Sequence, residues 1–140
     1  MTEAVKLHFL VDGEDFTSAG QASVQVKKSL RQLGIAPEII RKVSIAMYEG
    51  EINMVIHANG GTADVEVYDD EIVIILSDRG PGIPNIELAM QEGYSTARDN
   101  IRTLGFGAGM GLPNMKKYTD SMEIDTRIGE GTTITMRVTL

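Results

Sequence analysis

The chain has 140 residues, a length that suits a single domain over residues 1–140 with one sizeable core. Its hydrophobic content of 42% and charged content of 24% are ordinary for a soluble globular protein. The formal net charge of −7 argues against nucleic acid or an anionic membrane as the main partner, because binding to either needs a basic field. The absence of Cys excludes disulfides, thiolate metal sites and a Cys nucleophile.

Membrane insertion and export are not expected either. No apolar segment approaches the roughly 20 residues that span a bilayer. Residues 1–12 lack the basic start and unbroken apolar run of a signal peptide. We therefore expect a soluble protein of the cytoplasm.

Hydrophobic periodicity predicts the elements of the first half. Apolar and polar side chains alternate over residues 5–11, which indicates a half-buried strand. Residues 17–33 place their apolar side chains on one helical face, and Gly34 supplies the C-terminal stop. Pro37 suits the first turn of a second helix, which we expect to run to about His57.

Two strands and a long irregular stretch follow a predicted helix end at residues 59–61. Polar and apolar residues alternate over 64–67, and residues 72–76 are apolar on both faces, which favours a central, covered strand. Residues 79–108 lose all periodicity, and a connection of this length is more often a functional lid than a plain loop. A third helix is expected at residues 109–119.

The chain ends in a predicted hairpin. Alternation continues to Leu140 after a turn at residues 129–131. The strand before that turn presents on one face Met122, Ile124, Thr126 and Ile128. The resulting order, β-α-α-β-β-loop-α-β-β, predicts an α/β two-layer sandwich. Three helices would cover one face of a mixed, mainly antiparallel sheet of about five strands.

The second helix carries two polar residues on an apolar stripe. Glu49 and Asn53 share this stripe with three isoleucines, and burying either without a partner costs roughly 1–3 kcal/mol. The Asn53 carbonyl oxygen suits a hard cation such as Mg²⁺, and Glu49 could accept a proton from a water or hydroxyl. Alternatively the pair marks the solvent edge of the helix, with Glu51 as another surface charge. Gly50 weakens a helix by roughly 1 kcal/mol, and close packing against another element is one explanation that the sequence suggests.

A second constellation follows the most apolar predicted strand. Asp78 would emerge there at the sheet edge, where its carboxylate can accept a hydrogen bond from an exocyclic amine such as that of adenine. Gly80 and Gly82 lack side chains, so a flat ring can approach the backbone. A simple turn is the alternative.

Two further segments are rich in glycine. Alternating glycines before a helix-capable run expose backbone N–H groups that can hold phosphate, although many such loops only turn the chain; they are Gly105, Gly107, Gly109 and Gly111. The segment 129–132 is fully explained as a turn when taken alone. The Walker pattern and the Gly-x-Ser-x-Gly elbow are absent, and with two His and no Cys we expect no zinc site.

Taken in order, these four pieces resemble the motifs of the GHKL ATPase class, which contains gyrase-type, chaperone-type and histidine-kinase-type nucleotide-binding domains. Glu49-x-x-x-Asn53 is similar to its N box, and Asp78-x-Gly80-x-Gly82 to its first glycine box. Residues 105–112 resemble the second glycine box, and Gly129-x-Gly131-Thr132 the last. The resemblance covers residues 38–140. Within the class the chain is most similar to the small serine/threonine kinases of bacterial anti-sigma and stress-switch systems, which the stretches 48–58 and 92–97 also resemble.

The resemblance implies ATP and Mg²⁺ as cofactors. Asp78 and Thr132 would bind the adenine. Asn53 would ligate Mg²⁺, and Glu49 would orient or deprotonate the attacking hydroxyl. The remaining nucleotide contacts would come from the two glycine boxes, through Gly80, Gly82, Gly105, Gly107, Gly109, Met110, Gly111 and Leu112.

The same resemblance implies partner proteins. The expected substrate is a serine or threonine of a small antagonist protein of the STAS type, a sigma factor is a second partner, and a homodimer is suggested by family analogy. Arg98 and Arg102 in the lid are candidates for contacts with the γ-phosphate. A nucleotide-sensing binding module without kinase activity and a plain ATPase are the alternatives, and the retained Glu49 favours the kinase.

Three residues depart from the usual pattern of the class. Arg79 places a bulky cation inside the first glycine box, at a variable position. Gly50 and Glu51 stand where small or apolar residues are more usual. None of them replaces a key residue.

Overall fold

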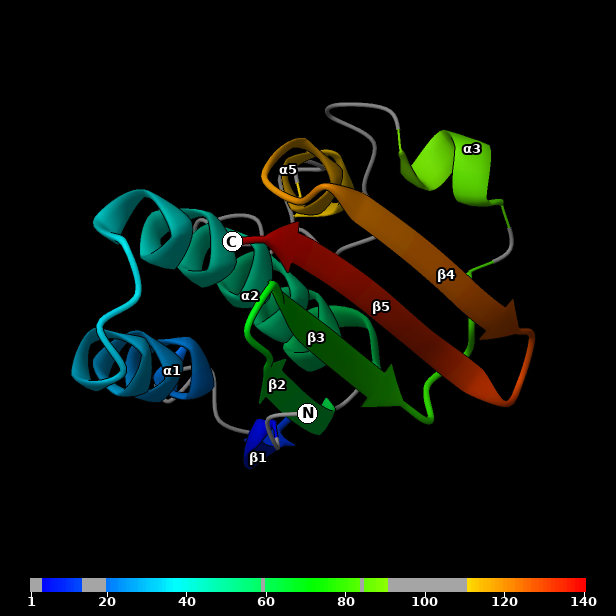
Figure 1. Cartoon of the computed structure of the whole chain (residues 1–140). Helices are drawn as coiled ribbons and strands as arrows, with labels where there is room; N and C mark the ends of the chain where they lie inside the picture. The colour runs from blue at the N-terminus through cyan, green and yellow to red at the C-terminus, as the bar shows by residue number, and fades with distance from the viewer. Residues whose placement is uncertain (1–3, 14–19, 59, 84, 91–110) are drawn as a thin grey trace, which may run out of the picture.

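The structure is a computed structural model that describes residues 4–13, 20–58, 60–83, 85–90 and 111–140. It has two layers, a five-stranded sheet and a set of helices packed on one of its faces (Figure 1). In chain order the elements are β1 (Val5–Asp12), α1 (Gln21–Gln32), α2 (Pro37–Ala58), β2 (Gly60–Val67), β3 (Glu71–Asp78), α3 (Ile86–Ala89), α5 (Gly111–Lys117), β4 (Ser121–Arg127) and β5 (Gly131–Thr139).

The strands follow the order β1-β2-β3-β5-β4, so β3 is the central strand, as its apolar sequence predicts. All pairings among the described strands are antiparallel, whereas we expected a mixed sheet. The reason for the difference is the place of β5. Strand β4 runs in the same direction as β3, but β5 lies between them and is antiparallel to both.

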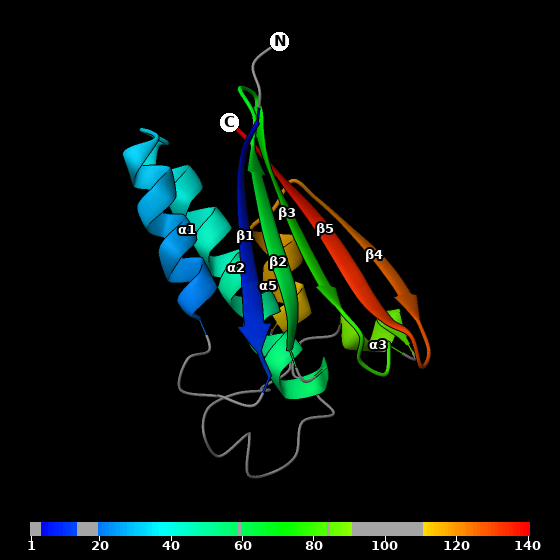
Figure 2. The ribbon, with the colours of Figure 1, turned by 90° about the horizontal axis from the view of Figure 1, so that it is seen from below.

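The core lies between the sheet and the helices. On β3, Ile72, Ile74 and Leu76 are buried on the face that the helices cover. Helix α2 is the centre of the helical layer, since it packs against α1 and α5 and against β1, β2, β3 and β5. Figure 2 shows these three helices on the same side of the sheet. The site residues of α2 are therefore held by a helix that is fixed from several directions.

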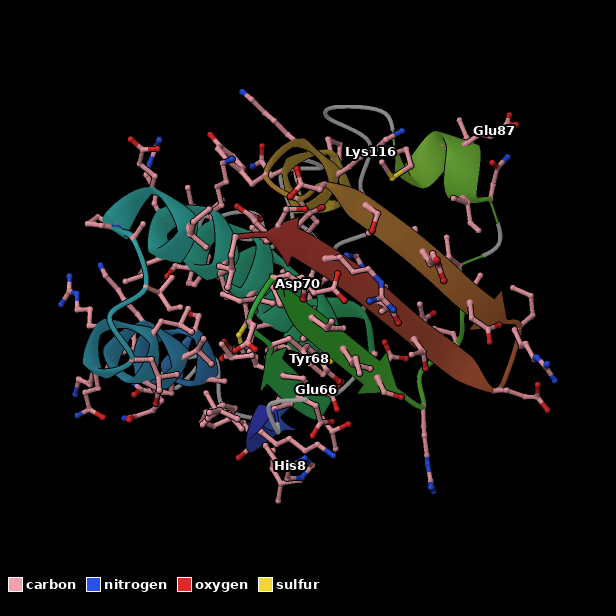
Figure 3. The ribbon with its side chains drawn as sticks, in the orientation of Figure 1. His8, Glu66, Tyr68, Asp70, Glu87 and Lys116 are labelled. Carbon is pink, nitrogen blue, oxygen red and sulfur yellow. The ribbon has the colours of Figure 1, made fainter. Side chains whose placement is uncertain are left out.

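The opposite face of β3 has no helix in front of it in Figure 1, in keeping with the expected helices on one face of the sheet. Val73 is nevertheless buried there, between its cross-strand neighbours Glu66 and Arg137. Long polar side chains can bury an apolar neighbour with their aliphatic parts. Tyr68 donates a hydrogen bond of 3.1 Å to Glu66 on this face, where Figure 3 shows both side chains together.

The predicted helices at residues 17–33, 37–57 and 109–119 correspond to α1, α2 and α5. Gly34 ends α1 in the left-handed conformation with φ 77°, as predicted for a glycine stop. The N–H of Ile35 then donates to the carbonyl of Leu30, which lies in the last turn. None of the helices in the described ranges is long and apolar enough to cross a membrane.

Helix α2 ends at Ala58, directly before the predicted stop at residues 59–61, and Gly60 and Gly61 already lie in β2. Two local predictions were wrong. Ile128 is 68% exposed in the turn before β5 and does not continue the face of β4. The short helix α3 lies in the stretch we expected to be irregular, since four residues are too few to display a helical period. Asn85 caps it by accepting a hydrogen bond from the N–H of Leu88 at 3.1 Å.

Candidate functional site

Helix α2 presents Glu49 and Asn53 one turn apart, and both side chains are half-buried. The two residues face α5. The amide of Asn114 donates from Nδ2 to Glu49 Oε1 at 3.4 Å, and Asn53 Nδ2 donates to the sulfur of Met115 at 3.9 Å. The pair is therefore not a bare solvent edge of the helix, and it lies where α2 meets the start of α5.

The close approach of the two helices depends on Gly111, the last glycine of the predicted phosphate loop. A Cβ at this position would lie only 2.6 Å from Asn53 Nδ2. Real Cβ atoms are not found this close to other heavy atoms, so glycine lets α5 begin beside Asn53. The next residue, Leu112, is buried in the core, which also anchors the start of α5.

Several residues that we expected around the phosphates lie outside the described residues. They are Arg98, Arg102, Gly105, Gly107, Gly109 and Met110, and the stretch 92–97 belongs to the same segment. Their roles stay predictions.

Gly50 has the structural explanation that the sequence suggested. A Cβ there would overlap Leu76 Cδ1 of β3 and would lie 3.1 Å from Met115 Cε of α5. Both neighbours are buried, with little room to move. The missing side chain at position 50 therefore lets β3 and α5 pack directly on α2, immediately next to Glu49.

Asp78 lies at the end of β3 and is half-buried. Its Oδ1 accepts hydrogen bonds from the N–H of Gly80 at 2.9 Å and from the N–H of Thr132 at 3.1 Å. Thr132 is itself 6% exposed, and its hydroxyl lies 2.8 Å from that of Thr126. The structure thus joins the predicted first glycine box at Asp78 to the last predicted box at Thr132, although the two are more than 50 residues apart in the sequence.

The glycines around Asp78 are in contact with protein atoms. A Cβ at Gly80 would lie 2.6 Å from the Cβ of Ala58, and one at Gly82 would lie 2.6 Å from the carbonyl oxygen of Arg127. Gly82 also has φ 83°, which favours glycine. A Cβ at Gly131 would overlap the carbonyl oxygen of Asp78. These packing needs explain the glycines, and their contact with a flat ring stays a prediction.

Glu51 was expected to be a surface charge, and this is wrong. The residue is only 2% exposed, and its carboxylate accepts from the N–H groups of Gly20 at 2.7 Å, Ala22 at 3.2 Å and Ser23 at 2.9 Å. Gly20 stands at the N-cap of α1 without a side-chain cap of its own, so α2 provides the missing acceptor. A signal was available: Glu51 follows the apolar residue Met47 by one helical turn.

Asn114 is the second residue that the sequence did not single out. It lies one turn after Gly111 on α5, and the same face of this helix carries Met115. The spacing alone could have indicated a residue that faces α2, but not which side chain of α2 it meets.

Charge in the described site comes from Glu49 and Asp78. No group of three or more His, Asp or Glu side chains in the described ranges could hold a metal ion by itself. A hard cation here would thus depend on oxygen atoms of a bound ligand, as Mg²⁺ does in phosphoryl-transfer sites.

Near the end of α2, burial lowers the pKa of the His57 imidazole below its usual value.

Sequence comparison identifies the family. The family of "Histidine kinase-, DNA gyrase B-, and HSP90-like ATPase" matches residues 38–140. The Anti-sigma F factor of Clostridium beijerinckii is 31% identical over 122 residues, which make up 83% of this chain and 82% of that protein. The Serine/threonine-protein kinase RsbT of Bacillus subtilis is 32% identical over 124 residues, which make up 86% of this chain and 85% of that protein.

Solved structures agree on the fold. A crystal structure of the RsbU and RsbW domains of a Mycobacterium tuberculosis protein matches 96% of this chain with a TM-score of 0.66 and 18% identity, and this chain covers 31% of it. The mycobacterial sensor histidine kinase MprB matches 96% of this chain and 97% of its own, with a TM-score of 0.55 and 17% identity. The chain therefore belongs to the family of histidine kinase-, DNA gyrase B- and HSP90-like ATPases.

Proposed function

We propose that this protein is an ATP-dependent protein serine/threonine kinase of a bacterial partner switch and that it acts in the cytoplasm. The family is one of ATPases, and one of the relatives is named as a serine/threonine-protein kinase. The observation that carries the proposal is the position of Glu49. Its carboxylate is half-buried beside the start of α5, one turn from Asn53. A protein that only held nucleotide would have no need of a carboxylate there.

ATP fits the described residues at its adenine end. Two backbone N–H groups hold Oδ1 of Asp78, which leaves the second carboxylate oxygen as an acceptor for the exocyclic amine. The buried Thr132 lies next to it and completes this end of the site. The phosphates would lie toward Gly111, where the predicted phosphate loop joins α5, and Arg98 and Arg102 are proposed for the γ-phosphate.

Mg²⁺ fits Asn53. The Nδ2 atom of this side chain is used by Met115, so the amide oxygen remains as a hard ligand. Bound Mg²⁺ would neutralise charge on the phosphates during transfer. Asn53 would hold the ion from the protein side, and Glu49 would orient or deprotonate the attacking hydroxyl of the substrate protein.

The proposed substrate is a serine or threonine on a STAS-type antagonist protein, and a sigma factor is proposed as a second partner. The relatives named as anti-sigma F factors support a role in such a switch. They also supply the second candidate function, a nucleotide-dependent binding module that captures its partner without phosphorylating it. A homodimer is a further proposal.

Label transfer separates these functions. The purified protein, Mg²⁺ and γ-labelled ATP are incubated with STAS-domain proteins encoded beside it, and wild type is compared with Glu49→Ala. We expect labelled substrate with wild type and a loss of about 100-fold or more with Glu49→Ala. Transfer that survives this substitution would sink the assignment of the base, and intact ATP binding without any transfer would favour the binding module.

The metal role of Asn53 has its own test. Asn53→Ala is expected to weaken the binding of Mg-ATP more than that of adenosine, because only the phosphates bring the cation. Isothermal titration with both ligands measures the difference, and equal losses for both would contradict the role.

A further inference from the structure

Helix α5 packs on α2 through one narrow stripe. Gly111, Asn114, Met115 and Tyr118 follow one another at spacings of three, one and three residues, so they lie on one face. Each has a contact on α2 or next to it. The stripe therefore sets how far along α2 the short helix lies.

The contacts run in opposite directions along the two helices. Gly111 lies against Asn53, and Asn114 donates to Glu49. Tyr118, just beyond α5, has the guanidinium of Arg41 over its ring at 5.9 Å from the centroid. As the chain of α5 advances, its partners move back toward the start of α2. The helices are thus antiparallel, and contacts at both ends and the middle fix a single register.

Within this register, Asn114 is the residue that meets the proposed base. Its Nδ2 is 3.4 Å from Glu49 Oε1, and both side chains are half-buried. At 3.4 Å the contact is a weak hydrogen bond, so we expect it to contribute little to the stability of the fold. An uncharged amide can donate to a carboxylate without neutralising it. It therefore suits a group that must stay able to accept a proton.

We infer that Asn114 is a positioning residue that orients the Glu49 carboxylate toward the attacking hydroxyl. The inference rests on the proposed function, in which Glu49 is the base. Helix α5 begins at the last glycine of the predicted phosphate loop. The same helix therefore does two things. Its Gly111 lies against Asn53, and its Asn114, three residues later, contacts the base Glu49.

The test uses Asn114→Ala and Asn114→Asp in the full chain. We expect kcat for label transfer from γ-labelled ATP to the STAS-domain substrate to fall about 10-fold in Asn114→Ala, since small misplacements of a reacting group are costly. The dissociation constant for Mg-ATP and the KM for ATP should change less than about twofold, because Asn114 acts only on the base. Asn114→Asp keeps the size but loses the donor and adds a like charge, so its kcat should fall further.

Two controls separate positioning from structure. Asn85→Ala removes an asparagine hydrogen bond at α3, away from the site, and should leave kcat unchanged. In a Glu49→Ala background, Asn114→Ala should have no further effect on residual transfer, because its only route to the reaction is gone. A purely structural role would lower transfer in both backgrounds.

The outcomes are distinct. Unchanged kcat in Asn114→Ala, an equal loss in the Glu49→Ala background, or a parallel loss of ATP affinity would overturn the inference while leaving the proposed function intact. Full transfer by Glu49→Ala would overturn the inference together with the assignment of Glu49 as the base, whereas intact ATP binding without any transfer by wild type would overturn the kinase function itself. If Asn114→Ala does not fold, Asn114→Asp tests the loss of the donor together with the added charge in a side chain of the same size, with thermal melting as the check on folding.

Discussion

Removing the carboxylate of Glu51 should detach the start of α1 from the rest of the helical layer. This carboxylate is 2% exposed and accepts from three backbone N–H groups at 2.7, 3.2 and 2.9 Å. Gly20 provides no side-chain cap, so in Glu51→Ala these donors would lose their acceptor inside the protein. The segment that begins α1 would then have to open toward water or remain unsatisfied.

The magnitude follows from the bonds that are lost. Leaving one buried donor unsatisfied costs about 1–3 kcal/mol, and loss of a helix N-cap costs about 0.5–2 kcal/mol. Part of this loss is offset, because an ionised carboxylate no longer has to be desolvated. We expect Glu51→Ala to lower the free energy of unfolding by about 3 kcal/mol, and the melting temperature by roughly 10 °C. Glu51→Gln keeps one acceptor oxygen but turns an NH₂ group toward the backbone donors, so about 2 kcal/mol is expected.

Urea unfolding followed by circular dichroism measures these differences, and hydrogen exchange at Ser23 locates them. The matched control is Glu123→Ala on β4, where the side chain is exposed and a change within about 0.5 kcal/mol is expected. Two results would refute the reasoning. One is a Glu51→Ala variant as stable as the control, and the other is a Glu51→Gln variant more stable than wild type.

Three further substitutions test the close packing at Gly50, the proposed adenine contact of Asp78 and the lowered pKa of His57. Gly50→Ala should destabilise by about 1–3 kcal/mol in urea despite the better helix propensity of Ala, since its Cβ would overlap the buried Leu76; a stabilised variant would contradict this. Asp78→Asn should weaken ATP binding roughly 10-fold or more in calorimetry, because an NH₂ group would meet the adenine amine, and an unchanged affinity would remove Asp78 from the site. Because desolvation lowers the pKa of His57, protonating its ring costs folding free energy; this cost is absent above about pH 6.5 and grows as the pH falls below that value. Wild type should therefore lose more unfolding free energy than His57→Gln on acidification below that value, and parallel curves would count against the shift.

The parts of the fold that the sequence predicts are those with a local period. Helix α2 follows from Pro37 and its apolar stripe, and the central place of β3 follows from a run that is apolar on both faces. The order of the strands does not follow, because the insertion of β5 between β3 and β4 is a matter of long-range pairing. Short elements such as α3 cannot be predicted either, because they contain too few residues to show a period.

The residues of the site also fall into those that the local sequence predicts and those that depend on long-range packing. The spacing of Glu49 and Asn53 predicts a shared side of one helix, and the structure confirms that both face α5. The roles of Glu51 and Asn114 depend on which backbone or side chain lies opposite, and that is decided by the packing of three helices. A carboxylate on an apolar stripe was the visible sign in the case of Glu51. Its partners, the bare N–H groups of another helix, carry no sequence pattern at all.

Three consecutive residues of α2 are fixed by three different parts of the molecule, and this explains how one carboxylate can be held in a defined direction. Gly50 admits Leu76 and Met115 directly against the helix, so α2 cannot rotate without a clash or a cavity. Glu51 is bound to the backbone at the start of α1. Successive helical residues point about 100° apart. Because positions 50 and 51 are held, the neighbouring side chain of Glu49 has little freedom beyond its own torsions. Gly50 and Glu51, two of the three residues that depart from the family pattern, thus support the geometry of the base at Glu49.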